Sequence, residues 1–204
     1  ENVHGKATIL QKMYGEYEDK FPQGRALYLY MAIHPGKMLD FMGNEFGQLR
    51  EYDESREQDW LLLDYPIHEA FANYRRTLNE LYRKYDAFWS GEYNPDHFLW
   101  LDCDHPELDA CAILRKGQEA AVFAAFNFGD TELKDYELTL PGLPEKELTF
   151  TLSESEHPRS PKLSIPFNPV FLPAGFVGFV LIGGGVIAVV LIIKRKKSCG
   201  KEQS

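Results

Sequence analysis

The residues best suited to chemistry lie in one short stretch that follows Gly43. Residues 45–60 offer carboxylates, a guanidinium donor and an indole ring. Carboxylates and arginine hydrogen-bond hydroxyl groups, while an indole covers the apolar face of a sugar ring. The mixture favours a polyhydroxylated ligand, bound by Glu45, Arg50, Glu51, Asp59 and Trp60. The structural alternative is that Glu45 and Arg50 form ion pairs that brace a loop, and that Trp60 belongs to the core.

Other kinds of functional site find little support in the sequence. Gly5-Lys6 lacks the upstream glycine of a phosphate-binding loop. The six histidines include no pair four residues apart, and no Gly-x-Ser-x-Gly elbow is present. We therefore expect no metal, no cofactor and no serine-hydrolase chemistry. The three cysteines, Cys103, Cys111 and Cys199, form neither a disulfide framework nor a metal-binding spacing.

The charge of the chain excludes one large class of partner. The formal net charge is −9, although basic residues gather after residue 193. The body of the chain is therefore more acidic than the total indicates, and it repels phosphate backbones. We expect no nucleic-acid partner.

The first part of the chain reads as parallel α/β architecture. Pro22 can open a helix over about 22–34, which is apolar on nearly all sides and should be buried among neighbours. His34-Pro35-Gly36 ends that helix, and residues 38–42 then read as a short inner strand. A second helix over about 67–88 carries a core-facing stripe, formed by Phe71, Tyr74, Leu78, Leu81, Tyr85 and Phe88.

The second part of the chain changes character after Asn94-Pro95. Short apolar runs alternate with turn residues, which is typical of an antiparallel β-sandwich. The runs are residues 98–101, 111–114, 121–128 and 136–140.

A third segment, residues 174–193, contains no charged or polar side chain. Twenty such residues span about 30 Å as a helix, the thickness of a bilayer core. The basic cluster at 194–197 resembles a stop-transfer signal. We expect a transmembrane helix here. The alternative is a buried strand over 176–181, followed by a break at the three glycines.

Several motifs together resemble a known family. They are Phe-Met-Gly-Asn-Glu-Phe-Gly-Gln at 41–48, His-Pro-Gly-Lys at 34–37, Gln-Asp-Trp-Leu-Leu-Leu-Asp at 58–64 and the run at 1–21. The chain resembles bacterial glycogen (1,4-α-glucan) branching enzymes of the α-amylase superfamily, strongly over about 1–140 and weakly over 141–181. The resemblance implies the C-terminal end of a (β/α)8 barrel, then an all-β domain. The expected domains are a barrel portion at 1–93, a β domain at 94–173, a membrane segment at 174–193 and a basic tail at 194–204.

The resemblance also implies that the reaction's acids lie outside this chain. The family has a Ser-His-Asp-Glu tetrad whose Asp is catalytic, and the chain begins at its final member, Glu1. The nucleophilic Asp and the acid/base Glu lie further upstream in the family. Retaining glycosyl transfer needs both, about 5 Å apart. We therefore expect a C-terminal fragment with no catalytic residue and no turnover of its own.

The resemblance leaves the chain with substrate contacts. Glu1 and His4 would border the site after the seventh barrel strand. The residues that would border it after the eighth are Glu45, Arg50, Tyr52, Asp59 and Trp60. Tyr52 and Gln58 replace the Trp and Leu that are common in the family.

The resemblance predicts a branching enzyme that moves α-1,4 chains to α-1,6 positions on an α-glucan such as glycogen or amylose, with its body in the cytoplasm. The apolar segment at 174–193 would add a membrane association. Two alternatives stay open: a membrane-anchored carbohydrate-binding protein without catalysis, and a hydrolase of the same superfamily.

Overall fold

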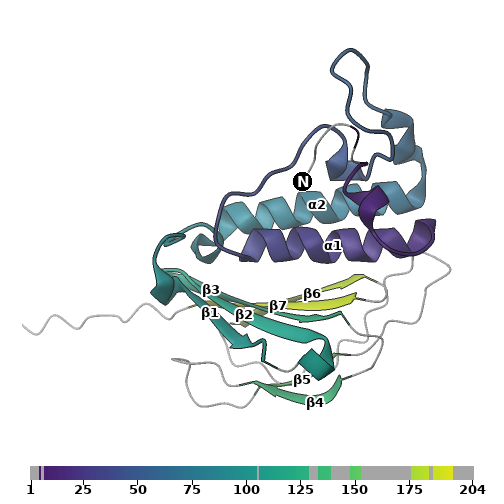
Figure 1. The fold of residues 1–204 in the computed structure, drawn as a ribbon. Coiled ribbons are helices and arrows are strands. Elements are labelled where there is room, and N and C mark those ends of the chain that lie inside the picture. Colours follow the sequence, from purple (N-terminus) through teal and green to yellow (C-terminus); the bar gives the residue numbers. More distant parts are fainter. Residues whose placement is uncertain are drawn as a thin grey trace, which may run out of the picture.

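The computed structural model describes residues 5, 7–104, 106–128, 133–138, 148–152, 176–183 and 186–194. Two α-helices lie over one face of an antiparallel sheet, and a second, two-stranded sheet lies beyond the other face (Figure 1). Short 3-10 turns lie in the connecting segments, at Leu10–Lys12, Asn44–Phe46, Trp60–Asp64, Asp86–Phe88, Pro95–His97 and Pro106–Leu108.

Helix α1, Tyr17–Ile33, begins earlier than its sequence predicts. Glu16 and Asp19 form a capping box, in which the Glu16 backbone N–H donates to the Asp19 carboxylate at 3.0 Å. This cap starts the helix five residues before Pro22, so the proline lies in the second turn and not the first. The predicted end is confirmed, because the helix stops at His34 before Pro35.

Helix α2, Pro66–Lys84, confirms the predicted second helix and its apolar stripe. Pro66 occupies the first turn, where the missing N–H costs nothing. Phe71, Leu78 and Leu81 are buried on one face. The helix ends before Tyr85, and the stripe continues into the following 3-10 turn, where Phe88 is also buried.

The main sheet confirms the predicted antiparallel β part. Its first three strands pair in chain order, as successive hairpins do. The full strand order is β1-β2-β3-β7-β6, and β4 pairs only with β5 in the second sheet. The strands are β1 Phe98–Asp102, β2 Ala110–Lys116, β3 Ala120–Asn127, β4 Leu133–Leu138, β5 Leu148–Leu152, β6 Phe176–Gly183 and β7 Val186–Lys194.

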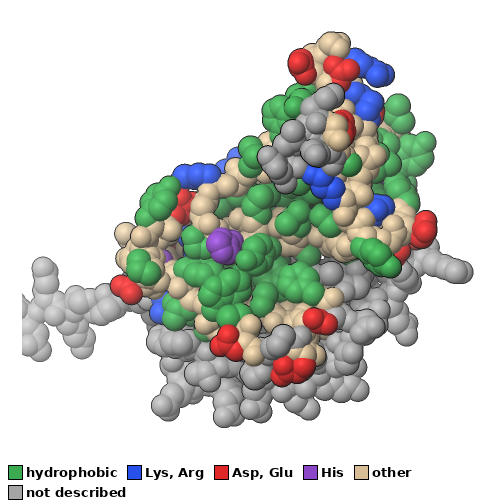
Figure 2. All heavy atoms as spheres, viewed as in Figure 1, with side chains coloured by type: hydrophobic (Ala, Val, Ile, Leu, Met, Phe, Trp, Pro, Cys, Tyr) green, Lys and Arg blue, Asp and Glu red, His purple; other side chains and the backbone are tan. Residues whose placement is uncertain are grey.

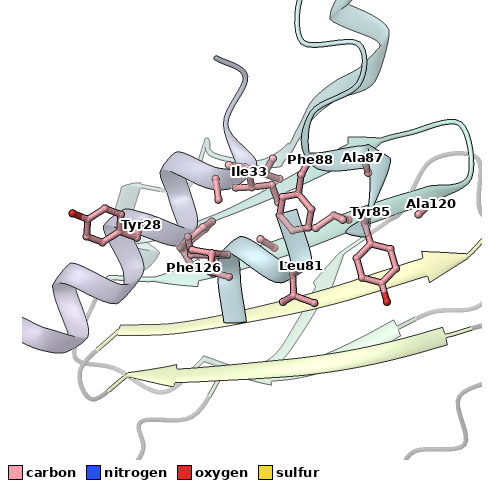
Figure 3. Packing of buried hydrophobic residues seen from close by; sticks show 14 of the residues in the cluster. Tyr28, Ile33, Leu81, Tyr85, Ala87, Phe88, Ala120 and Phe126 are labelled. Carbon is pink, nitrogen blue, oxygen red and sulfur yellow. The ribbon is translucent and has the colours of Figure 1, made fainter. Parts of the chain in front are cut away.

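One hydrophobic cluster joins the helices to the sheet (Figure 3). It combines Tyr28 and Ile33 of α1, Leu81 of α2, and Phe126 of β3. The cluster thus contains residues from both sides of Asn94, and the domain boundary expected there stays a prediction.

The expected inner strand at residues 38–42 is wrong: this segment forms no strand, belongs to neither sheet and turns at Met42, whose φ is 29°. A parallel strand needs a neighbour that accepts and donates along its backbone. Among the described residues, none pairs with this segment in that way. The expected C-terminal end of a (β/α)8 barrel is not shown by the described residues, whose strands all pair antiparallel.

The expected membrane helix at 174–193 is also wrong in the described residues, where β6 and β7 form an antiparallel hairpin. Gly183 pairs with Val186 at the last paired position of the hairpin. The Val- and Ile-rich sequences of β6 and β7 favour strands over helix. None of the helices that the structure describes is long and apolar enough to cross a membrane.

Candidate functional site

The candidate site is the segment from Gly43 to Trp60, here called the 43–60 loop, which projects beyond the helices (Figure 1). Gly43 and Gly47 bound its first turn with φ of 88° and 74°. Both angles lie in the left-handed region that glycine enters without strain. A Cβ on Gly43 would also lie 2.8 Å from the side chain of Gln48. The glycines therefore let Gln48 pack under the start of the loop.

The buried amide of Gln48 joins the two ends of the loop. Its Nε2 donates to the carbonyl of Arg50 at 2.9 Å, and its Oε1 accepts the backbone N–H of Asp59 at 2.9 Å. The side chain is 1% exposed. Buried hydrogen bonds of this kind are costly to leave unmade. Gln48 is the organising residue that our sequence reasoning missed, although it closes the motif at 41–48.

Arg50 and Asp59 form an ion pair across the base of the loop. The Arg50 Nη2 lies 2.9 Å from Asp59 Oδ1, and Nε lies 3.2 Å from both carboxylate oxygens. Nη2 also donates to the carbonyl of Glu57 at 2.8 Å. The hydrogen bond to Asp59 raises the pKa of Arg50. The guanidinium therefore braces the loop, as the structural alternative predicts, with Asp59 as its partner.

Glu51 ties the loop to the start of the chain. Its two carboxylate oxygens accept the backbone N–H groups of Gly5 and Ala7. A carboxylate that accepts two backbone donors makes charge-assisted bonds, which are stronger than neutral ones. The segment next to His4 is thereby fixed against the 43–60 loop.

Glu45 is half-buried in the first turn, and its Oε2 accepts the N–H of Gly43 at 3.0 Å. Glu45 thus helps to hold the turn in which it lies. Its second oxygen, Oε1, takes no part in that hydrogen bond.

Two pairs of aromatic rings include side chains of the loop, one at its end and one near its middle. Trp60 is 48% exposed and packs against buried Phe46, with ring centroids 5.1 Å apart. Tyr52 meets exposed Phe41 edge to face at 5.0 Å. The interpretation of Trp60 as a core residue is therefore wrong: one side of its ring rests on Phe46, and nearly half of the side chain is exposed.

His68 of α2 is hydrogen-bonded to Phe46, the buried residue on which Trp60 packs. Its Nδ1 donates to the carbonyl of Phe46 at 2.8 Å, because a carbonyl can only accept. The side chain is fully buried and contacts the rings of Phe21 and Tyr65. Burial lowers the pKa of His68, so the imidazole is neutral at pH 7.

Of the predicted contacts, Glu1 and His4 lie outside the described residues. The other five belong to the 43–60 loop, where an ion pair, two ring contacts and the hydrogen bond to Glu45 hold their side chains. Figure 2 shows charged side chains of both signs at the projecting top of the molecule, with hydrophobic side chains below them. Such a surface can stack on a ring and hydrogen-bond hydroxyl groups. The carboxylates of Glu45 and Glu51 accept backbone N–H groups, and the carboxylate of Asp59 accepts from Arg50.

A separate open hollow of about 390 Å³ lies on α2, lined by Arg76, Asn79, Tyr82 and Arg83. None of the predicted site residues lines it. It therefore gives no support to the predicted site.

Most of this chain is similar in sequence to known proteins. No protein-family model matches the chain. The chain is 39% identical over 152 residues to the 1,4-alpha-glucan branching enzyme GlgB of Halothermothrix orenii. The matched residues make up 74% of this chain and 24% of that enzyme. The chain is related to bacterial branching enzymes. The GlgB of Bacillus caldolyticus is 38% identical over 151 residues, covering 72% of this chain and 23% of the relative.

The chain spans about a quarter of the length of these branching enzymes. The resemblance stated from the motifs is thus confirmed as a partial match.

Proposed function

We propose that this chain is the part of a 1,4-α-glucan branching enzyme that supplies glucan contacts, while the reacting carboxylates belong to residues outside these 204. The observation that carries the proposal is the 43–60 loop, which presents Trp60 beside an ion pair in a chain related to such enzymes. An α-glucan is uncharged and rich in hydroxyl groups, with apolar ring faces that stack on indole.

In this proposal the loop residues divide into two groups. Trp60 and Tyr52 contact sugar rings. Gln48, Arg50 and Asp59 are positioning residues, because their polar atoms hold the loop ends together. A loop that is already rigid loses less conformational entropy on binding than a flexible loop does.

The two aromatic side chains, Trp60 and Tyr52, have a specific role in chain transfer. A retaining enzyme forms a covalent glycosyl intermediate, which either water or a sugar hydroxyl then resolves. Transfer dominates when a bound acceptor glucan occupies the site and excludes water. An aromatic surface at the rim of the site would hold that acceptor.

A chimera tests the proposal. The matching segment of the Bacillus caldolyticus enzyme is replaced by this chain, and α-1,6 branches formed in amylose are counted after enzymatic debranching. We expect branches from the chimera and none from the chain alone. Release of reducing ends without branches would replace the transferase by a hydrolase of the same superfamily. In the same chimera Trp60→Ala should lower the number of branches, whereas Trp89→Ala, at an equally exposed tryptophan outside the loop, should not.

A further inference from the structure

Two cysteines lie at the loop end of the β1–β2 hairpin, where residues 103–109 connect the two strands. The register pairs Trp100 with Ile113, and after a bulge it pairs Asp102 with Ala112. The next position along the hairpin holds Cys103, which follows β1, and Cys111 of β2. Continuing the register by one residue past its last pair would set the two cysteines opposite each other.

Opposed residues in an antiparallel pair have Cα atoms about 4.5–5.5 Å apart. A disulfide needs a Cα separation of about 4.4–6.8 Å. Opposed residues of an antiparallel pair also share a face of the sheet. The continued register thus meets the backbone requirement for a bridge, while the Cys103 thiol lies 3.7 Å from Asp104 Oδ1.

The two thiols differ in accessibility. Cys103 is exposed, whereas Cys111 is half-buried against the hydrophobic cluster. Burial raises the pKa of Cys111 to about 11, and Cys103 and Asp102 add to the shift. Desolvation, Asp104 and Asp102 raise the pKa of Cys103 as well. Because Cys103 is the exposed thiol, a soluble reagent meets it first.

We propose that Cys103 and Cys111 form an oxidisable dithiol site, which a small disulfide such as oxidised glutathione converts to an intramolecular bridge. The Cys103 thiolate attacks one sulfur of the reagent and releases one glutathione thiolate. The Cys111 thiolate then attacks Cys103 Sγ and releases the second. Two electrons pass to the reagent, and the two protons lost from the cysteines are taken up by the glutathione thiolates or by solvent.

Both steps depend on pH. The thiolate is the attacking species, and the raised pKa values of Cys103 and Cys111 keep both thiolate fractions small at neutral pH. The carboxylates of Asp102, near both thiols, and Asp104, beside Cys103, contribute to these shifts. Closure to the bridge should accelerate as the pH rises.

The bridge would change the edge of the main sheet. β1 is an edge strand and pairs only with β2 among the described strands. Edge strands open more readily than central ones. A covalent link at the loop end of the hairpin would hold that end of β1 on β2 and protect the residues next to Cys103 from exchange.

The experiment treats the full chain with a glutathione redox buffer at neutral and at mildly alkaline pH, followed by acid quenching and alkylation of free thiols. Cleavage after Glu107 separates the two cysteines unless a bridge joins them. We expect one linked peptide pair that is lighter than the two thiol peptides by two hydrogens, and slower amide exchange in β1.

The third cysteine supplies the matched control. C199S should form the same bridge, whereas C103S and C111S should stop at mixed disulfides with glutathione. The peptide map of the unmodified chain decides the question even where a variant folds poorly. A mixed disulfide that never closes at either pH, or a bridge to Cys199 instead, would overturn the proposal.

Discussion

The main sheet and the 43–60 loop are positioned by different forces. All eight residues of β3 are buried, and the strand has a backbone partner on each side. In the loop, by contrast, Trp60 is 48% exposed and the chain path depends on side-chain bonds from Gln48, Arg50 and Glu51. The difference shows that burial of apolar side chains stabilises the sheet. A few polar contacts instead hold the loop surface that we propose binds glucan. Each region should therefore respond to a different kind of substitution.

The largest expected effect is in the sheet. Phe126 of β3 is fully buried and meets Tyr30 edge to face at 5.8 Å. Phe126→Ala should lower the free energy of unfolding by about 3–5 kcal/mol, through lost burial and a cavity. Urea unfolding measures this loss. Phe128→Ala is the matched control, because Phe128 stacks on Phe126 but is 52% exposed. Equal losses in both variants would contradict the account of the sheet.

The next effect is in the loop. Gln48→Ala removes both amide bonds and leaves the carbonyl of Arg50 and the N–H of Asp59 without that partner. We expect a loss of about 1–3 kcal/mol in the free energy of unfolding, together with faster proteolysis between residues 50 and 59. Gln118→Ala, at an exposed position, should change neither. Unaltered proteolysis in Gln48→Ala would show that other contacts hold the loop.

A smaller effect should appear as a pH dependence. Burial lowers the pKa of His68 in the folded chain, so the unfolded chain binds this proton more readily. The contribution of neutral His68 to the free energy of unfolding is thus fully present above the unfolded pKa of about 6.5. It is lost as the pH falls below that value, by at most about 1.4 kcal/mol per pH unit.

The measurement is the urea midpoint from neutral to mildly acidic pH. His68→Asn keeps a donor for the carbonyl of Phe46 but does not titrate, so its midpoint should fall less steeply with acid. A slope equal to that of the unmodified chain would assign the pH dependence to other groups.

Sequence patterns predicted the strands of the sheet well because each strand carries its own signal. The runs at 98–101, 111–114 and 121–128 each coincide with an observed strand to within a few residues. The stripe from Phe71 to Phe88 similarly placed α2 and its buried face.

Features that depend on distant partners were harder to predict. Residues 38–42 have a strand-like composition, yet strand pairing needs a neighbour that the pattern does not specify. The start of α1 was missed because the capping box of Glu16 and Asp19 outweighed the preference of Pro22 for a first turn. The motif at 41–48 pointed to the loop, but the partner of Arg50 and the bridging role of Gln48 are set by tertiary contacts. Cys103 and Cys111 were considered by spacing alone, and only the strand register, continued by one residue, would set them opposite each other.

The most direct test of the central claim is the affinity of the full chain for glycogen, measured by gel electrophoresis in the presence of the polymer. Trp60→Ala should weaken binding about tenfold, as truncation of an aromatic anchor does. Trp89→Ala, with the same exposed fraction of 48%, should bind like the unmodified chain. Thermal unfolding checks that both variants fold. Equal affinity in all three proteins would contradict the claim that the 43–60 loop is a glucan-contacting surface.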